Sequence, residues 1–338
     1  MNYLSIIFTK LLFSSILLFA HIIFAIDPPF GRLSVHHGQL VNSVGKPVVL
    51  RGISLFNSEW QLDFWTPDVV KAIKCYYNAN VVRLAVGTDH PWDDMDRIIN
   101  IVNASIDLGL YVLIDWHNAG DGGYDFGSGV ADFNAFVSNA VDFFSFISHL
   151  YADVPNMLYE MWSEPAWVEW RTIKYYHYNV MVAIRINDKR AVIIVGTPDW
   201  STGPNFDVIH SPVVGYNILY ALHWYAIDDK LHHIMQHRMI INAKSSGLGT
   251  FVSEYGTTTL TEQAPVEYEM VKLWWKFLEK SQVSYINWSM SNKNESTAII
   301  KPNCTPDQIT QEQCITESGI FLRNHLWSFD NGVKCGKI

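Results

Sequence analysis

Positive charge is scarce in this sequence. Its 338 residues include 24 Lys and Arg against 33 Asp and Glu, which gives a formal net charge of −9 at pH 7. Nucleic acids and anionic membrane surfaces both recruit basic proteins. We therefore expect no nucleic acid and no stable membrane association among the partners of this protein.

The N-terminal stretch lacks charge almost completely. Lys10 is the only charged residue before Asp27, and residues 11–26 are almost wholly apolar. This run is shorter than the roughly 20 residues of a membrane span, and no polybasic flank follows it. A signal peptide over residues 1–25, cleaved near Ala25, is favoured over a membrane anchor, and the protein is expected to be secreted and extracellular.

Cysteine is also scarce, and no two cysteines are spaced as C-x-x-C, which argues against a zinc site. Outside the cell an even number of cysteines suggests up to two disulfides, with three possible pairings. A bridge between Cys304 and Cys314, which share a polar loop, is the simplest expectation. The remaining cysteines are Cys75 and Cys335.

The chain after the leader shows no Pro/Ser-rich linker, low-complexity tract or block of like charge. This favours one domain over residues 30–328, with a C-terminal tail at 329–338. Near-continuous apolar runs are typical of strands that are covered on both faces. There are eight such runs, at residues 48–55, 81–86, 111–117, 157–165, 191–197, 218–226, 250–256 and 284–290.

Segments with helical spacing lie between several of these runs, at residues 68–77, 94–108, 133–150, 167–186 and 267–280. Eight strands that alternate with helices predict an α/β protein, a single (β/α)8 TIM barrel. A doubly wound open sheet would instead want a G-x-G-x-x-G turn after the first strand. Residues 52–55, Gly-Ile-Ser-Leu, do not supply one.

Polar residues and Trp gather at the carboxyl ends of six predicted strands. In a TIM barrel these ends meet at one face, where active sites form. Burying one charge in an apolar setting is costly, so a convergent set of this kind is hard to explain as packing. The set comprises Arg83, Asp115 and His117, Glu164, His223 and Tyr225, Glu254, and Trp288.

Two of these residues, Glu164 and Glu254, fit the chemistry of glycoside hydrolysis. One carboxyl group must be protonated to donate to the leaving oxygen, and the other must be ionised to attack the anomeric carbon. Arg83 would keep one carboxylate ionised. His223 and Tyr225 could donate hydrogen bonds, and Trp288 offers a platform for a sugar ring.

The ordered motifs resemble glycoside hydrolase family 5, and within it the bacterial-type endo-β-1,4-glucanases, or cellulases. The resemblance runs from about residue 51 to residue 326, and the order and spacing of the motifs make it specific. The motifs are Arg51-Gly52-Ile53-Ser54 with Trp60, Val82-Arg83, Ile114-Asp115-Trp116-His117, the run from Tyr159 to Pro165, the run from Ala221 to Ala226, the run from Val252 to Gly256, and Asn287-Trp288-Ser289 with Lys293 and Glu295.

The resemblance implies that Glu164 is the general acid/base and Glu254 the nucleophile of a retaining reaction. It implies a β-glucan substrate and neither a metal nor a cofactor. Separately, we expect a monomer, although the sequence does not determine the oligomeric state. The residues that it assigns to substrate binding are Arg83, His117, Ser163, His223, Tyr225, Trp288, Trp60, Lys293 and Glu295.

The sequence departs from the family pattern in two places. Ser163 stands where the family motif has an Asn that hydrogen-bonds the sugar 2-hydroxyl next to the scissile bond. Serine has a shorter reach, so a water would have to bridge. The loop over residues 303–316 also lacks the usual glycine-rich stretch and carries two cysteines.

These departures leave alternatives to the endo-1,4-β-glucanase. One is a carbohydrate-binding protein with weakened or lost catalysis, because Ser163 replaces the family Asn. Another is a hydrolase of xylan, mannan or mixed-linkage glucan. His232, His233 and His237 are more typical of a solvated helix than of a metal site, and Asn303 is a plausible glycosylation site.

Overall fold

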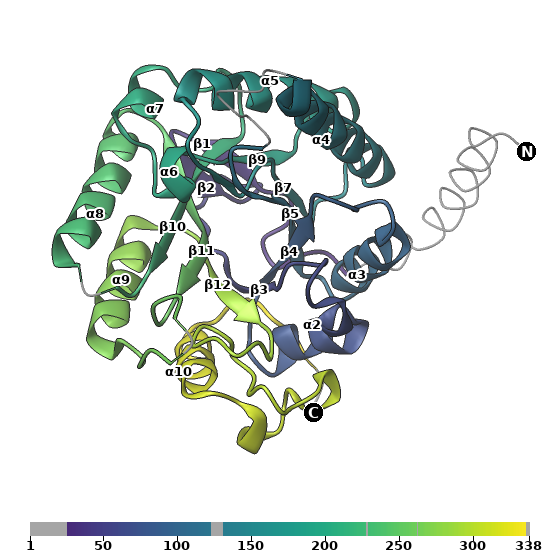
Figure 1. Ribbon diagram of the computed structural model, residues 1–338, viewed down its shortest axis with the longest axis vertical. Coiled ribbons are helices and arrows are strands. Elements are labelled where there is room, and N and C mark those ends of the chain that lie inside the picture. Colours follow the sequence, from purple (N-terminus) through teal and green to yellow (C-terminus); the bar gives the residue numbers. More distant parts are fainter. Residues whose placement is uncertain (1–25, 123–130, 228, 262, 336–338) are drawn as a thin grey trace, which may run out of the picture.

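A closed barrel of parallel strands forms the centre of the molecule, as predicted. The computed structural model describes residues 26–335 apart from 123–130, 228 and 262. Figure 1 looks into the barrel, with helices packed around its outside. Neighbouring strands follow the chain order and the last pairs with the first: β3 (Arg51–Leu55), β4 (Val81–Gly87), β5 (Tyr111–His117), β7 (Met157–Glu160), β9 (Val192–Val195), β10 (Ile218–Tyr225), β11 (Gly249–Gly256) and β12 (Tyr285–Met290).

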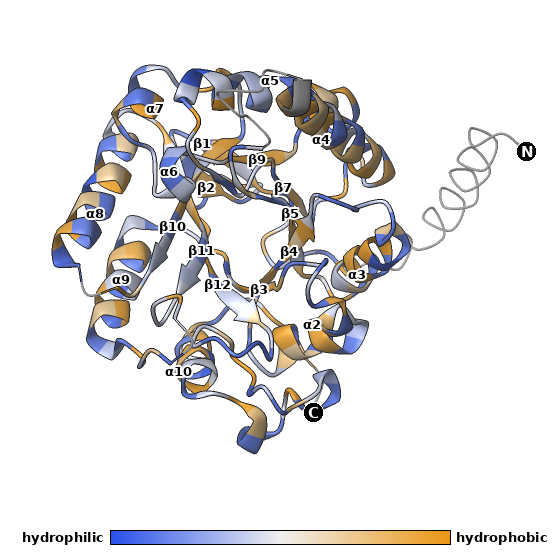
Figure 2. Ribbon diagram, viewed as in Figure 1, coloured by the Kyte–Doolittle hydropathy of each residue, from blue (hydrophilic) through white to orange (hydrophobic). Residues whose placement is uncertain are grey.

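The helices pack apolar residues against the barrel, such as Ile73 of α2 and Trp274 of α9, and Figure 2 shows hydrophobic and hydrophilic residues mixed along them. α2 begins as expected: the Thr66 side chain accepts from the Val69 amide and Pro67 takes the first position. α5 starts at Trp170 and not at residue 167, because Trp167 has a left-handed φ of 58°. The longer helices are α2 (Pro67–Cys75), α3 (Met95–Asp107), α4 (Ala131–Leu150), α5 (Trp170–Asn187), α8 (Lys230–Ser245), α9 (Tyr268–Ser281) and α10 (Glu317–Leu326).

A short hairpin closes the amino-terminal end of the barrel. Its strands are β1 (Ser34–His36) and β2 (Gln39–Val41). Leu33 and Leu40 pack with the first residues of the barrel strands in one apolar cluster, which includes Tyr111 and Phe251. The polar residues of the barrel lie at the opposite end, where the strands finish.

The predicted strand at 157–165 is wrong in extent. It divides into β7 and the two-residue strand β8 (Glu164–Pro165), which pairs with β6 (Ala119–Gly120). The Ser163 amide donates to the Trp116 carbonyl at 3.1 Å, and the Glu164 amide donates to the Asn118 carbonyl at 3.1 Å. This second pairing fixes the backbone of Glu164 beyond the end of β7.

Two disulfides tie segments of the chain together. The expected Cys304–Cys314 bridge is confirmed, and Cys75 at the end of α2 is bonded to Cys335. Asn331, within the expected tail, is fully buried. The expected signal peptide lies outside the described residues. In the part of the chain that the structure describes, no helix has the length and apolarity to cross a membrane.

Candidate active site

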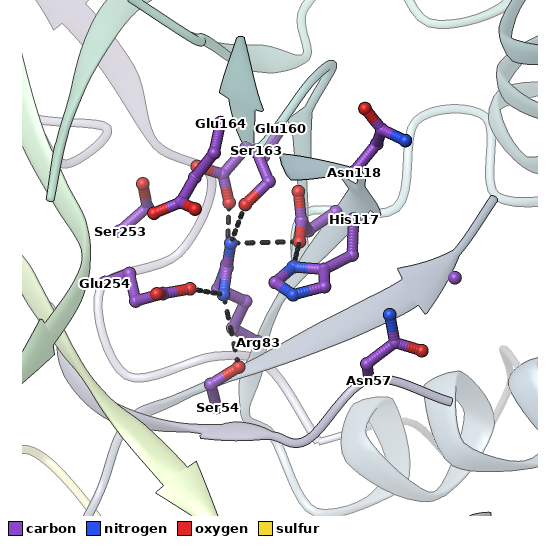
Figure 3. A network of polar contacts seen from close by, with 12 residues as sticks. Ser54, Asn57, Arg83, His117, Asn118, Glu160, Ser163, Glu164, Ser253 and Glu254 are labelled. Atoms are coloured by element: carbon purple, nitrogen blue, oxygen red, sulfur yellow. Dashed lines mark hydrogen bonds and ion pairs between the residues drawn. The ribbon is translucent and has the colours of Figure 1, made fainter. Parts of the chain in front are cut away.

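Arg83 is the centre of the polar network at the carboxyl end of the barrel (Figure 3). It projects from the middle of β4 and is completely buried. Because the guanidinium is removed from water, its charge must be balanced by partners within the protein. The partners are Glu160 (Nε to Oε2, 2.7 Å), Glu254 (Nη1 to Oε2, 2.8 Å), Asp115 (Nη2 to Oδ2, 2.9 Å) and the Ser163 hydroxyl (Nη2 to Oγ, 2.8 Å).

Two acidic partners of Arg83, Glu160 and Asp115, have pKa values shifted in opposite directions. Burial alone would raise the pKa of Glu160, but the positive charges of Arg83 and of His223, 3.6 Å away, outweigh it and lower the pKa to about 2. Burial raises the pKa of Asp115 to about 6, although Arg83 and His117 oppose it. Glu160 is thus the more firmly ionised counter-ion of Arg83, whereas burial makes ionisation of Asp115 harder than usual.

Glu254, near the end of β11, is held as a carboxylate. Its Oε2 accepts from Arg83, and its Oε1 accepts from the hydroxyl of Tyr225 on β10. Burial would raise the pKa of Glu254, but the charges of His223 and Arg83 and the Tyr225 hydrogen bond lower it below its usual value. An ionised carboxylate with oriented oxygens can act as a nucleophile.

Glu164 is joined to His223 rather than to Arg83. His223 Nδ1 lies 2.8 Å from Glu164 Oε1, and its Nε2 lies 3.0 Å from the Ser253 hydroxyl. Burial alone would lower the pKa of His223, but Glu254, Glu160 and Glu164 outweigh it and raise the pKa to about 10. The protonated imidazole donates to one Glu164 oxygen. The other oxygen remains available on a side chain that is 17 % exposed.

His117 and Trp288 form one wall of the site. His117 Nδ1 is 2.8 Å from Asp115 Oδ2, which directs its Nε2 away from the carboxylate. Its ring stacks on Trp288 with centroids 5.0 Å apart and an interplanar angle of 11°. Phe56 contacts the same indole at 5.0 Å. The indole is therefore held on two sides.

The outer predicted residues lie on segments that follow β3 and β12. Trp60 stands apart from the Arg83 network, 70 % exposed on the turn after β3. The Lys293 ammonium lies 5.3 Å from the centroid of Phe56, which packs on Trp288. Burial raises the pKa of Glu295, which accepts a hydrogen bond from Thr297.

One trio within the described residues has the spacing of metal ligands. The ligand atoms of Glu164, His223 and Glu254 all lie within 4.8 Å of one another. Metal binding requires a neutral imidazole, whereas His223 has a raised pKa of about 10 and both its nitrogens have partners. The trio suits proton and glycosyl transfer better than metal coordination.

The histidines of α8 have structural contacts. His233 Nε2 is 2.9 Å from the Ile227 carbonyl, and its Nδ1 accepts from Trp274. His237 stacks on Phe277 with ring centroids 4.0 Å apart. These rings pack between α8 and α9, so the solvated face predicted for them is only partly correct.

Sequence reasoning did not assign a role to Asp115, Glu160 or Ser253, although all three lie in the quoted motifs. The sequence held a usable signal for Asp115 and Glu160. An acidic residue inside an apolar run is buried with the run and therefore requires a buried cation as partner. Ser253 gave no comparable signal, since serine is common in strands of any role.

The sequence is similar to those of known proteins over most of its length. The sequence model described as "Cellulase (glycosyl hydrolase family 5)" matches residues 41–294. Endoglucanase A of Butyrivibrio fibrisolvens is 30% identical over 88% of this chain and 69% of its own length. The chain belongs to glycosyl hydrolase family 5. Endoglucanase N of Pectobacterium atrosepticum, 33% identical over 88% of this chain, is matched over 65% of its length. The chain thus spans about two thirds of these family 5 relatives.

Solved structures of other proteins share this fold. A structure from Cytophaga hutchinsonii superposes with a TM-score of 0.80 at 31% identity, covering 88% of this chain and 94% of that one. The catalytic domain of Thermobifida fusca endoglucanase Cel5A superposes with a TM-score of 0.78 at 28% identity, covering 89% and 99%. A variant of that catalytic domain has been solved in complex with cellotetraose.

Proposed function

We propose that this protein is a secreted, retaining endo-1,4-β-glucanase that cleaves internal β-1,4-glucosidic bonds of cellulose-like glucans. The observation that carries the proposal is the facing pair Glu164 and Glu254, which have oxygens within 4.8 Å of each other. Retaining glycosidases hold their two carboxyl groups about 5–5.5 Å apart, whereas inverting ones leave about 6.5–9.5 Å for a water. The short separation supports retention.

In the first step Glu254 Oε attacks the anomeric carbon while Glu164 protonates the departing glycosidic oxygen. The bond from the anomeric carbon to that oxygen breaks, and a covalent glycosyl ester on Glu254 forms. Arg83 and Tyr225 aim the attacking carboxylate through their hydrogen bonds. His223 orients Glu164 through Nδ1 and leaves its second oxygen to carry the proton.

In the second step Glu164, now ionised, removes a proton from a water that attacks the same carbon from the opposite side. Glu254 leaves as a carboxylate, which the lowered pKa of Glu254 favours. The new hemiacetal keeps the β configuration. The buried cations Arg83 and His223 remain in place through both steps and balance the change of charge.

A β-1,4-glucan substrate is supported by the family and by the aromatic surfaces around the pair. Relatives are named endoglucanases, and one family 5 domain has been solved with cellotetraose. Trp60, which is 70 % exposed, offers a flat apolar face that suits the face of a glucose ring, whereas Trp288 is buried between His117 and Phe56 and would contact a sugar only by its edge. Two disulfides support secretion, since disulfides persist in oxidising compartments. We propose that the protein is a monomer and has no nucleic-acid partner.

The proposal is tested by release of reducing ends from carboxymethyl cellulose together with a fall in viscosity. Glu254→Gln should reduce kcat by at least about 10³-fold, because the nucleophile is lost. Glu169→Gln, which removes an exposed carboxylate before α5, is the control. A Glu254→Gln protein as active as wild type would overturn the assignment of the nucleophile.

Ser163 favours a second candidate, a glucan-binding protein with weakened catalysis. Its hydroxyl is fully buried and already accepts from Arg83 Nη2 at 2.8 Å. Ser163 therefore has less hydrogen-bonding capacity left for a substrate hydroxyl than the side-chain amide of an asparagine would have. Losing one preorganised transition-state donor costs roughly 10²–10³ in rate.

A panel of β-glycans separates the candidates. We expect wild type to cleave cellulose derivatives slowly and Ser163→Asn to cleave them faster. Cello-oligosaccharide binding without turnover in wild type, with turnover in Ser163→Asn, would favour the binding protein. Preference for xylan, mannan or mixed-linkage glucan would keep the enzyme and change its polymer. Unchanged or lower activity in Ser163→Asn would show that the serine is not a defect.

A further inference from the structure

The turn that bears Trp60 is fastened to the end of β4. This turn, residues 57–61, begins directly after β3. The Ser58 amide donates to the Ala85 carbonyl at 3.0 Å, and the Ser58 hydroxyl accepts from the Gly87 amide at 3.0 Å. Figure 3 draws Asn57, the first residue of the turn, beside the Arg83 network. The turn is therefore an extension of the barrel rather than a separate loop.

Glu59 fastens the same turn to the segment between β4 and α3. Its Oε1 accepts from the amides of Asp89 at 2.7 Å and His90 at 3.1 Å. Gly87 leaves room for this carboxylate, since a Cβ on Gly87 would lie 2.3 Å from Glu59 Cδ. The turn and the segment after β4 are thus joined through one side chain.

A second connection leads from the turn to the disulfide loop. Gln61 Nε2 donates to Asn292 Oδ1, and Asn292 Nδ2 donates to the Cys304 carbonyl at 2.8 Å. Cys304 is bonded to Cys314, which closes the loop that departs from the family pattern. Asn292 also immediately precedes Lys293, so one residue connects two predicted sugar-binding segments.

The packing of Trp60 itself does not fix its position, because its side chain is 70 % exposed. Its neighbours on both sides, Glu59 and Gln61, make the connections instead. Fixing a flat aromatic side chain before binding reduces the entropy lost when a ligand is bound. The bonding pattern is therefore suited to a preorganised platform.

We propose that Asn292 and Glu59 are positioning residues for glucan binding, and that they act by holding the Trp60 platform between the disulfide loop and the segment after β4. The inference rests on the proposed function to the extent that Trp60 contacts the glucan. It adds a role for the Cys304–Cys314 loop. That loop supports the Trp60 turn through Asn292 and Gln61, rather than only stabilising the fold.

The test measures binding without turnover. Calorimetric titration of the Glu254→Gln protein with cellohexaose and with cellobiose gives Kd for a long and a short ligand. Asn292→Ala should raise the Kd for cellohexaose about 5-fold, the usual value of one lost hydrogen bond. In a Trp60→Ala background the same substitution should have no further effect, because the platform is already gone.

Two comparisons separate positioning from a general structural effect. Asn294→Ala, two residues further along the same segment and exposed, should leave the Kd unchanged. Glu59→Ala should weaken cellohexaose binding, and Glu59→Gln, which keeps an accepting oxygen, should recover most of the loss. The thermal unfolding midpoint of each variant reports whether the barrel is intact. Glu59 provides the same readout if Asn292→Ala does not fold.

The outcomes are distinct from those of the proposed function. Failure of wild type to hydrolyse carboxymethyl cellulose would remove the proposed activity and leave the binding test in force. An unchanged Kd in Asn292→Ala, an equal effect with and without Trp60, or no binding of cellohexaose at all would overturn the inference.

Discussion

Three glutamates at the site differ in their surroundings, and these surroundings suit them to different roles. Glu164, Glu254 and Glu160 are the same residue type within one network, yet only Glu254 and Glu160 contact Arg83. Glu160 is enclosed and fixed as a counter-ion with a pKa of about 2. Glu254 keeps one oxygen toward Tyr225, and Glu164 contacts His223 on the partly open side. These different surroundings are consistent with the separate roles that we propose, Glu254 as nucleophile and Glu164 as acid/base.

Tyr225→Phe tests how the nucleophile is kept ionised. The hydroxyl of Tyr225 donates to Glu254 Oε1 and helps to lower its pKa, so losing the donor should raise that pKa. Since Glu254 must be ionised to attack, the acid-side limb of kcat/KM should move to higher pH, and kcat should fall about 10-fold.

The pH profile of kcat/KM on cello-oligosaccharides measures this shift. Tyr268→Phe, which removes a similar Tyr–Glu hydrogen bond on the surface, serves as the matched control. An acid-side limb that stays in place in Tyr225→Phe would mean that the tyrosine does not tune Glu254.

At this scale the sequence predicted which residues meet at the site better than it predicted how they pair. Arg83, His223 and Tyr225 follow from strand ends that must meet at one face of a barrel. Their pairing does not follow, because it depends on which side of each strand faces the centre and on distances between strands. Asp115 and Glu160 were missed as partners of Arg83 for this reason.

Elements were predictable where their signals are local. The apolar runs and the Thr66-Pro67 start identify β4 and α2, since burial and capping are properties of neighbouring residues. The break between β7 and β8 was not predictable. It is caused by pairing of Glu164 with Ala119, and such a contact leaves no mark on the hydropathy of the run.

The segment after α10 is also fixed by distant contacts, and Asn331→Ala tests its contribution. Asn331 Oδ1 accepts from Arg51 at 2.8 Å, and its Nδ2 donates to the Asn78 carbonyl at 2.7 Å. Removing this amide leaves buried groups without partners, so we expect unfolding to become easier by about 1–3 kcal/mol with kcat unchanged.

Denaturant unfolding of Asn331→Ala measures the effect, with the exposed Lys334→Ala as control. Equal stability of the two variants would show that the tail segment contributes nothing to the fold.

For the whole molecule, alternation of strands and helices was enough to predict the closed barrel, because few architectures bury eight apolar strands on both faces. The disulfide between distant cysteines could not be predicted from the sequence. Cys75 and Cys335 are separated by 260 residues, and only the folded chain brings α2 and the tail together.

The two disulfides should therefore differ in their effect on stability. A cross-link constrains the unfolded chain more when it closes a longer loop, and the separations are 260 and 10 residues. Cys75→Ser/Cys335→Ser should lower the free energy of unfolding by about 2–5 kcal/mol, more than Cys304→Ser/Cys314→Ser. Thermal or denaturant unfolding of both double variants measures the difference, and the reverse order would contradict it.

The central claim is that Glu254 forms a covalent bond to a β-1,4-linked glucosyl unit. A 2-deoxy-2-fluoro cellobioside with a good leaving group slows hydrolysis of such an intermediate, so mass spectrometry and peptide mapping can locate it. We predict one glycosyl unit per chain, attached to the peptide that contains Glu254, and β-configured product when turnover resumes. A label on another residue, or an α-configured first product, would contradict the account.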